Sequence, residues 1–164
     1  MQKELLDQLE TPCVVIDMAK AEENVIRMQA EADAAGCRLR PHIKTHKMPL
    51  FARMQLAHGA AGITCAKVSE AEVMADGGAD DIFIAYPMVG GFRIKRAVAL
   101  ARRLKRLILA VDSMECAVPL NEAAKAAGIT LEVRLEVDTG AKRTGVQRTK
   151  AAELAKEVHQ LSNL

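Results

Sequence analysis

The sequence predicts an α/β protein in which parallel strands alternate with helices along the chain. Short β-branched runs are separated by Ala-rich amphipathic stretches, and this alternation is typical of repeated strand–helix units. The connections are only about 2–6 residues long, which fits α/β units better than separate modules. The core must be aliphatic, because the 164 residues are 50% hydrophobic yet include one Tyr, three Phe and no Trp. Such a sheet is either open and doubly wound or closed as a (β/α)₈ barrel.

The expected elements follow one another in order. Each expected strand is a short aliphatic or β-branched run bounded by turn residues, at 13–16, 38–42, 62–66, 81–85, 107–111 and 131–137. Each expected helix has apolar residues at helical spacing, at 19–35, 49–58, 69–76, 91–104, 114–127 and 149–161.

Several helix ends carry their own signals. Ser69 and Glu72 have the spacing of a capping box, which predicts that a helix begins at Ser69. Glycines also follow helical patterns at positions where a residue free to adopt positive φ closes the last turn. These are Gly36, Gly59, Gly77 and Gly128.

Composition and charge limit the classes of function. A net charge of only +2 and the scarcity of aromatic side chains argue against nucleic-acid binding. No run approaches the ~20 apolar residues of a membrane span, so we expect no membrane association. The scattered cysteines form no CxxC pair, which predicts reduced thiols in a cytoplasmic protein. They are Cys13, Cys37, Cys65 and Cys116.

Both candidate folds place ligands at the carboxyl ends of their strands, so residues just beyond those ends are the candidates for a site. They are His42–His46, Lys67, Ser69, Tyr86, Asp112 and Asp138–Arg143. We therefore expect one face of the sheet to carry the function.

Lys44 is the strongest candidate nucleophile. It lies in a run from Arg40 to Lys47 that also contains His42 and His46. Like charges disfavour an ammonium ion, and a free amine can form Schiff bases with carbonyl substrates or with pyridoxal phosphate. The alternative is a solvated basic loop.

Two further questions remain open, one about the two histidines of this run and one about Tyr86. His42 and His46 have the i, i+4 spacing of a zinc pair, but Pro41 precedes them and no H-E-x-x-H motif is present. Tyr86 and Pro87 predict a fixed turn that aims the phenol into the site, which makes Tyr86 a candidate cofactor contact. The alternative for Tyr86 is a buried packing role.

A second group of candidates lies between Glu136 and Val146. Two glycines bracket a cationic loop, so both the backbone and Arg143 can approach a ligand closely. A guanidinium stays protonated and would leave a neighbouring ring nitrogen unprotonated. Asp138 is either a ligand contact or the acceptor of an Asx turn or ion pair. Gly90 and Gly91 precede a basic helix and are either a helix-terminal anion site or a simple turn.

Several segments together resemble one enzyme family. They are Thr11-Pro12 with Val15-Ile16-Asp17, Arg40-Pro41-His42-Ile43-Lys44-Thr45-His46-Lys47, Ser69-Glu70-Ala71-Glu72, Asp80-Asp81-Ile82 with Ala85-Tyr86-Pro87, and Glu136-Val137-Asp138-Thr139-Gly140 with Arg143 and Gly145. In this order they span nearly the whole chain and are similar to the D-threonine aldolase and D-serine dehydratase family. Members of that family are pyridoxal-phosphate enzymes with a barrel of the alanine racemase type.

The resemblance implies a fold and a set of roles. Residues 1–164 would form an amino-terminal, cofactor-binding barrel domain that is incomplete, with about five of the eight barrel strands. Residues 1–17 would supply a strand to a flanking β-domain. Lys44 would carry pyridoxal phosphate and later act as a base, with His42 or His46 as proton carriers and Arg143 facing the pyridine nitrogen.

The resemblance also implies an activity. We expect the amino-terminal part of a lyase that cleaves D-β-hydroxy amino acids to glycine and an aldehyde. The alternatives are elimination to an oxo acid and ammonia, as in D-serine dehydratase, or a pyridoxal-phosphate-binding protein without catalysis. A divalent metal belongs to the full-length family members, but its ligands have no counterpart in this chain. Because an open sheet leaves unpaired edges, we expect a homodimer or a second chain that completes the barrel.

Overall fold

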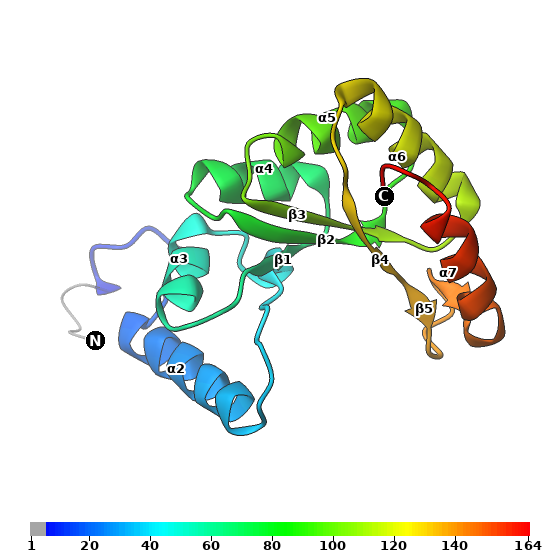
Figure 1. Cartoon of the computed structure of the whole chain (residues 1–164). Coiled ribbons are helices and arrows are strands. Elements are labelled where there is room, and N and C mark those ends of the chain that lie inside the picture. The colour runs from blue at the N-terminus through cyan, green and yellow to red at the C-terminus, as the bar shows by residue number, and fades with distance from the viewer. Residues whose placement is uncertain (1–5) are drawn as a thin grey trace.

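The computed structural model describes residues 6–164 as an arc of parallel strands with helices on its outer side (Figure 1). Strands β1 (Ile63–Cys65), β2 (Asp81–Pro87), β3 (Arg106–Val111) and β4 (Glu132–Leu135) pair in parallel, in the order β1-β2-β3-β4. A doubly wound sheet reverses its strand order at a switch point, whereas unbroken sequential order puts every crossover helix on the same face. The fold is therefore part of a (β/α) barrel, and the doubly wound alternative is wrong.

The helices agree closely with the sequence-based expectations. They are α2 (Met18–Ala34), α3 (Pro49–Ala57), α4 (Val68–Asp76), α5 (Gly91–Ala101), α6 (Met114–Ala127) and α7 (Ala151–His159). Two single-turn 3₁₀ helices are η1 (Ile43–Thr45) and η2 (Arg148–Lys150), and the short strands β5 (Val137–Asp138) and β6 (Val146–Gln147) pair in a second sheet. Among residues 6–164, none of the helices has the length and apolar character that crossing a membrane requires.

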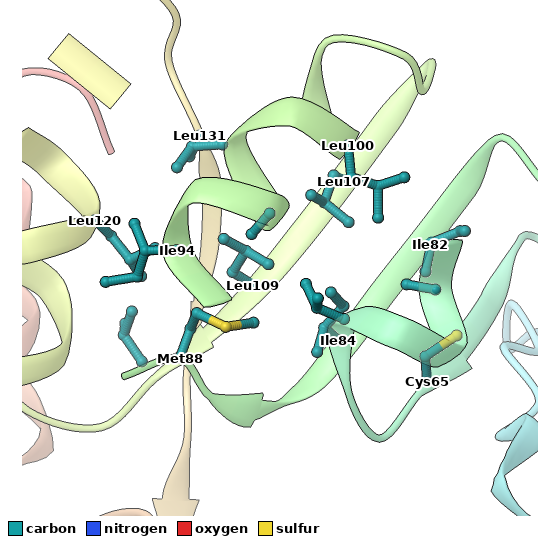
Figure 2. Packing of buried hydrophobic residues seen from close by; sticks show 14 of the residues in the cluster. Cys65, Ile82, Ile84, Met88, Ile94, Leu100, Leu107, Leu109, Leu120 and Leu131 are labelled. Carbon is teal, nitrogen blue, oxygen red and sulfur yellow. The ribbon is translucent and has the colours of Figure 1, made fainter. Parts of the chain in front are cut away.

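The hydrophobic core lies between the sheet and helices α4, α5 and α6 (Figure 2). Ile82 and Ile84 of β2 and Leu107 and Leu109 of β3 are almost completely buried there. Side chains alternate between the two faces of a strand, so their neighbours Phe83 and others face the opposite, inner side. The outer face of the sheet therefore packs against the helices, and the inner face faces away from them.

The segment 38–42 differs from its expectation. It runs beside β1 but makes only one isolated bridge, between His42 and Thr64, and is not a regular strand. Pro41 has no amide hydrogen to donate to a ladder, although its carbonyl accepts from Thr64 N at 2.7 Å. The main sheet therefore has four hydrogen-bonded strands rather than five.

The amino-terminal segment also differs. Residues 13–16 form no strand in the structure. The expectation that residues 1–17 pair with a flanking β-domain remains a prediction, and its first five residues, 1–5, lie outside the described part of the chain.

The predicted capping box at Ser69 is wrong. Helix α4 begins at Val68, with Lys67 as its N-cap and no side-chain capping bond. Glu72 instead forms an ion pair with Arg96 of α5, because it lies on the side of α4 that faces that helix. The carboxylate near the start of α4 is Glu70, which accepts from Ala66 N at 2.9 Å.

The expected glycine ends are mostly present. Gly128 closes α6 in the left-handed region, with φ 66°. Gly77 follows α4 but has φ −80°, and the positive φ of 97° falls on Gly78 instead. The helix thus ends one residue before the position that needs glycine for its backbone.

A ladder of alternating charges crosses the inner face, from the amino ends of β2 and β3 to Arg134 near the end of β4. Arg40 Nη1 lies 2.8 Å from Asp81 Oδ1, and Arg106 Nη1 lies 3.5 Å from Asp81 Oδ2. Arg106 also pairs with Glu132 through its Nε, at 2.7 Å, and Arg134 Nη2 lies 2.8 Å from Glu132 Oε1. We call these five residues the charge ladder.

Candidate active site

A pocket of about 310 Å³ lies on the inner face, near the carboxyl ends of the strands. Lys44 and Arg143, which are far apart in the sequence, both line it. The other residues that line the pocket are His42, Phe83, Ala85, Ala110, Arg134, Leu135 and Glu136. The two main candidates therefore share one cavity, as the position rule for parallel sheets predicts.

Lys44 lies in the short helix η1, and its neighbours hold it in place. The preceding residue, Ile43, is fully buried and anchors the turn in the core. His42 Nδ1 accepts a hydrogen bond from Lys44 N at 3.3 Å, and Lys47 N donates to Ile43 O at 2.8 Å. The exposed Lys44 side chain is therefore carried by a fixed backbone.

The cations around Lys44 are paired with carboxylates, which the sequence did not indicate. Arg40 forms its ion pair with Asp81 in the charge ladder. Lys47 Nζ lies 3.2 Å from Glu70 Oε1. The expected crowd of unpaired positive charges is thus absent at Arg40 and Lys47, because each finds an anion from a segment distant in sequence.

The two histidines have different surroundings. Burial and the charge of Lys44 lower the pKa of His42, which lines the pocket. Burial also lowers the pKa of His46, whose Nδ1 accepts from Met48 N at 3.1 Å and whose ring packs edge-on against Phe51. Both imidazoles are therefore neutral near pH 7, and of the two only His42 is among the residues lining the pocket.

Arg143 lies in a loop whose base is held by side-chain oxygens. Asp138 Oδ1 accepts from Gly140 N at 2.8 Å and from Lys142 N at 3.0 Å, which is the Asx-turn alternative. These hydrogen bonds lower the pKa of Asp138. Gly145 has φ 101°, and a Cβ there would lie only 2.6 Å from Asp138 N, so this position requires glycine.

Glu136 lines the pocket; the sequence analysis placed it at the start of the second group of candidates but gave it no role of its own. Its Oε1 accepts from Thr144 Oγ1 at 2.5 Å, whereas its Oε2 is buried and has no hydrogen-bond partner among the described residues. A buried carboxylate oxygen without a partner is costly, and a polar ligand group would satisfy it. Glu136 directly follows the last residue of β4, and this position at a strand end was the feature of the sequence that could have marked it as a site residue.

Tyr86 does not line this pocket. Its side chain is 51% exposed near the end of β2, so the buried packing alternative is wrong. It is not among the residues that line the pocket, and its contact with a cofactor remains a prediction. Gly90 precedes α5 with φ 89°, which is the geometry of a turn.

Within residues 6–164, no group of three or more His, Cys, Asp or Glu side chains is placed to hold a metal. The i, i+4 spacing of His42 and His46 falls in a 3₁₀ turn, where the two rings have different hydrogen-bond partners.

The fold and the site define a class of protein. It is a partial parallel barrel in which a lysine and an arginine line one pocket near the carboxyl ends of the strands, the position at which barrels of this type bind their ligands. The family described as alanine racemase, N-terminal domain, matches residues 16–164. The chain belongs to that family, as the resemblance in its sequence implied.

Individual relatives are similar over most of this chain but are much longer. The D-threo-3-hydroxyaspartate dehydratase of Delftia sp. (strain HT23) is 42% identical over 146 residues, which are 89% of this chain and 38% of the relative. The D-threonine aldolase of Arthrobacter sp. is 40% identical over 141 residues, which are 86% of this chain and 37% of the relative. This chain therefore spans about two fifths of the length of these relatives.

A solved structure shows the same arrangement of elements. The crystal structure of D-threonine aldolase from Filomicrobium marinum superposes with a TM-score of 0.91 at 38% identity. The match covers 94% of this chain and 42% of that one. The partial barrel is thus the amino-terminal part of a larger architecture in that protein.

Proposed function

We propose that this chain forms the amino-terminal part of a pyridoxal-phosphate-dependent lyase that acts on D-β-hydroxy amino acids. The observation that carries the proposal is the meeting of Lys44 and Arg143 in one pocket near the carboxyl ends of the strands. The names of the relatives support the substrate class, since they act on D-threonine or 3-hydroxyaspartate.

The residues present fit this cofactor. The pocket offers an amine for covalent attachment and a permanent cation. Its volume of about 310 Å³ falls at the lower end of the range for small-molecule sites, roughly 300–1,000 Å³. When bound, pyridoxal phosphate supplies an electron-poor ring that stabilises negative charge next to the substrate nitrogen.

Each residue then has a stated task. Lys44 would hold the cofactor through Nζ and, as a free amine, would hold or take up a proton at the same atom. His42 is neutral and lies in the same pocket, so it can accept a proton there. Arg143 is assigned to the ring nitrogen, which its fixed charge would keep unprotonated.

The attachment of the cofactor can be tested directly. Pyridoxal phosphate added to the wild-type chain is expected to give a visible absorption band and, after borohydride, a stable adduct on Lys44. Lys44→Ala is expected to lose both, whereas Lys105→Ala, an exposed lysine at the opposite ends of the strands, is expected to keep them. If Lys44→Ala gives the same band and adduct as wild type, the assignment is wrong.

Aldol cleavage is the leading reaction and elimination is the second candidate. A relative named as an aldolase matches at 40% identity and a relative named as a dehydratase matches at 42%, so identity does not favour one reaction. D-Threonine and D-serine distinguish them, because cleavage releases glycine and an aldehyde whereas elimination releases an oxo acid and ammonia. Cofactor binding without either product would favour the third reading, a non-catalytic pyridoxal-phosphate protein.

The setting and partners are proposals of the same kind. A reduced, cytoplasmic location is supported by the four cysteines, which are all free thiols. A homodimer or a second chain that completes the barrel would cover the open strand edges. A divalent metal is proposed only for the full-length protein, as the family resemblance implies. Residues 6–164 hold no group of three or more side chains placed to bind one.

A further inference from the structure

We propose that Glu70 is a positioning residue for Lys44, because its buried carboxylate clamps the far end of the loop that carries the lysine. This inference rests on the proposed function and adds to it a residue outside the pocket. Glu70 belongs to α4, the helix that follows β1, and does not line the pocket itself.

The loop that carries Lys44 has two anchors. The first is Ile43, whose side chain is fully buried in the core. The second is Lys47, whose Nζ lies 3.2 Å from Glu70 Oε1. Lys44 lies between them, so the placement of its backbone depends on both ends being held.

The backbone at Lys47 requires such a hold. Lys47 has φ 52°, in the left-handed region that residues with a Cβ avoid. Strained backbone of this kind persists only where the surroundings fix it. The Glu70 carboxylate is the one charged group that the described residues place against the Lys47 ammonium.

Glu70 is itself held rigidly. It is only 7% exposed, although a buried carboxylate needs compensating partners. Its Oε2 accepts from Ala66 N at 2.9 Å, just beyond the end of β1. Burial opposes ionisation, but this hydrogen bond and Lys47 outweigh it and lower the pKa of Glu70. The carboxylate therefore ties the end of β1 to the end of the Lys44 loop.

The test measures cofactor attachment at Lys44 in wild type, Glu70→Gln and Glu72→Gln. Glu72 is the matched control, because it forms an ion pair from the same helix but points to Arg96 of α5. Each chain is titrated with pyridoxal phosphate, fixed with borohydride and mapped by peptide mass analysis. Thermal unfolding of the three chains is measured alongside.

Glu70→Gln is expected to weaken the apparent affinity for pyridoxal phosphate by about tenfold, the effect of losing one charge-assisted contact. It is also expected to shift borohydride labelling from Lys44 towards other lysines. Glu72→Gln is expected to match wild type in both. Labelling is compared at a temperature at which thermal unfolding shows all three chains to be folded, so a loss of selectivity there does not come from a general loss of stability.

Lys47→Met removes the same ion pair from its exposed end and leaves the buried carboxylate in place. If Glu70→Gln does not fold, Lys47→Met tests the positioning role in its place. It is also expected to weaken the attachment of pyridoxal phosphate at Lys44. In the double variant the two effects should not add, because both remove one interaction.

The outcomes separate the two proposals. If wild type gives no adduct at Lys44, the proposed function fails and this inference fails with it. If wild type gives the adduct and both Glu70→Gln and Lys47→Met match it in affinity and selectivity, only the positioning role is overturned.

Discussion

Lys44 and Arg143 are brought together by the backbone, and neither depends on the other for its position. Ile43 fixes the first from within the core, and the Asx turn of Asp138 fixes the loop of the second. Neither side chain needs a contact with the other for the pocket to exist. The backbone positions of the two residues are therefore set by contacts that involve no ligand.

The four thiols are expected to react very differently. Burial raises the pKa of Cys65 to about 12, so at pH 8 roughly one in ten thousand of these groups would be a thiolate. Burial also raises the pKa of Cys116, whereas Cys13 and Cys37 are exposed. A colorimetric thiol reagent should label two groups promptly in the native chain and four in denaturant.

Cys37→Ser provides the control for this count. It is expected to lower the prompt labelling from two groups to one and leave the slow groups unchanged. Prompt labelling of three or four thiols in the native wild type would contradict the burial of Cys65 and Cys116.

At this scale the sequence predicts which residues meet but not how their charges are balanced. Lys44 and Arg143 could be placed together because both follow strands of one parallel sheet. The pairing of Arg40 with Asp81 depends on strand register across 41 positions, which composition and local spacing do not contain. From the sequence alone, Glu70 is only an acidic residue four positions before Met74, which puts both on one face of the helix; the structure shows that this face of α4 is buried.

The residue that follows helix α6 has a backbone conformation that makes its replacement by alanine destabilising. Gly128 has φ 66°, and a Cβ built there would meet nothing within 4 Å. Gly128→Ala should therefore lower the free energy of unfolding by about 1–2 kcal/mol through backbone strain alone. The measurement is urea unfolding followed by circular dichroism.

Gly91→Ala is the matched control for that change. Gly91 begins α5 without a positive φ, and its Cβ would also meet nothing within 4 Å. This change is expected to stabilise the chain by about 0.4–1 kcal/mol, because alanine restricts the unfolded state. Equal effects at the two positions would contradict the backbone explanation.

Elements were predicted well where a period was clear and poorly where a single residue interrupts it. All six expected helices are present, since their apolar spacing extends over several turns. The segment 38–42 has the composition of a strand, but Pro41 interrupts the donors and leaves a single bridge. The capping-box spacing at Ser69 was misleading because Glu72 has a stronger partner in Arg96.

The stability of the whole molecule should depend on pH in a direction set by its shifted groups. Among residues 6–164, six side chains have pKa values below the ordinary ones, which are 6.5 for His, 4.5 for Glu and 3.8 for Asp. They are His42, His46, Glu70, Glu72, Glu132 and Asp138. The unfolded chain binds protons more tightly at these groups, so acid favours unfolding.

The free energy of unfolding is therefore expected to fall as the pH drops below about 6.5, where the histidines begin to take up protons. It should fall again below about 4.5, where the carboxylates follow. At alkaline pH the raised pKa values of Cys65 and Cys116 act in the opposite direction, so stability should decline above about 9. Urea unfolding at pH 10, 8, 6, 5 and 4 tests this, and greater stability at pH 5 than at pH 8 would refute it.

The charge ladder has a consequence for how the chain reaches this fold. A strand that slips by one residue turns its apolar side chains to the wrong face, and burial excludes that error. A slip by two residues keeps every face correct, so hydrophobic patterning alone does not detect it. In the native register Asp81 lies opposite Arg106, and a two-residue slip would part them by about 6–7 Å. The ion pairs of the charge ladder therefore favour the native register of β2, β3 and β4 over a register shifted by two residues.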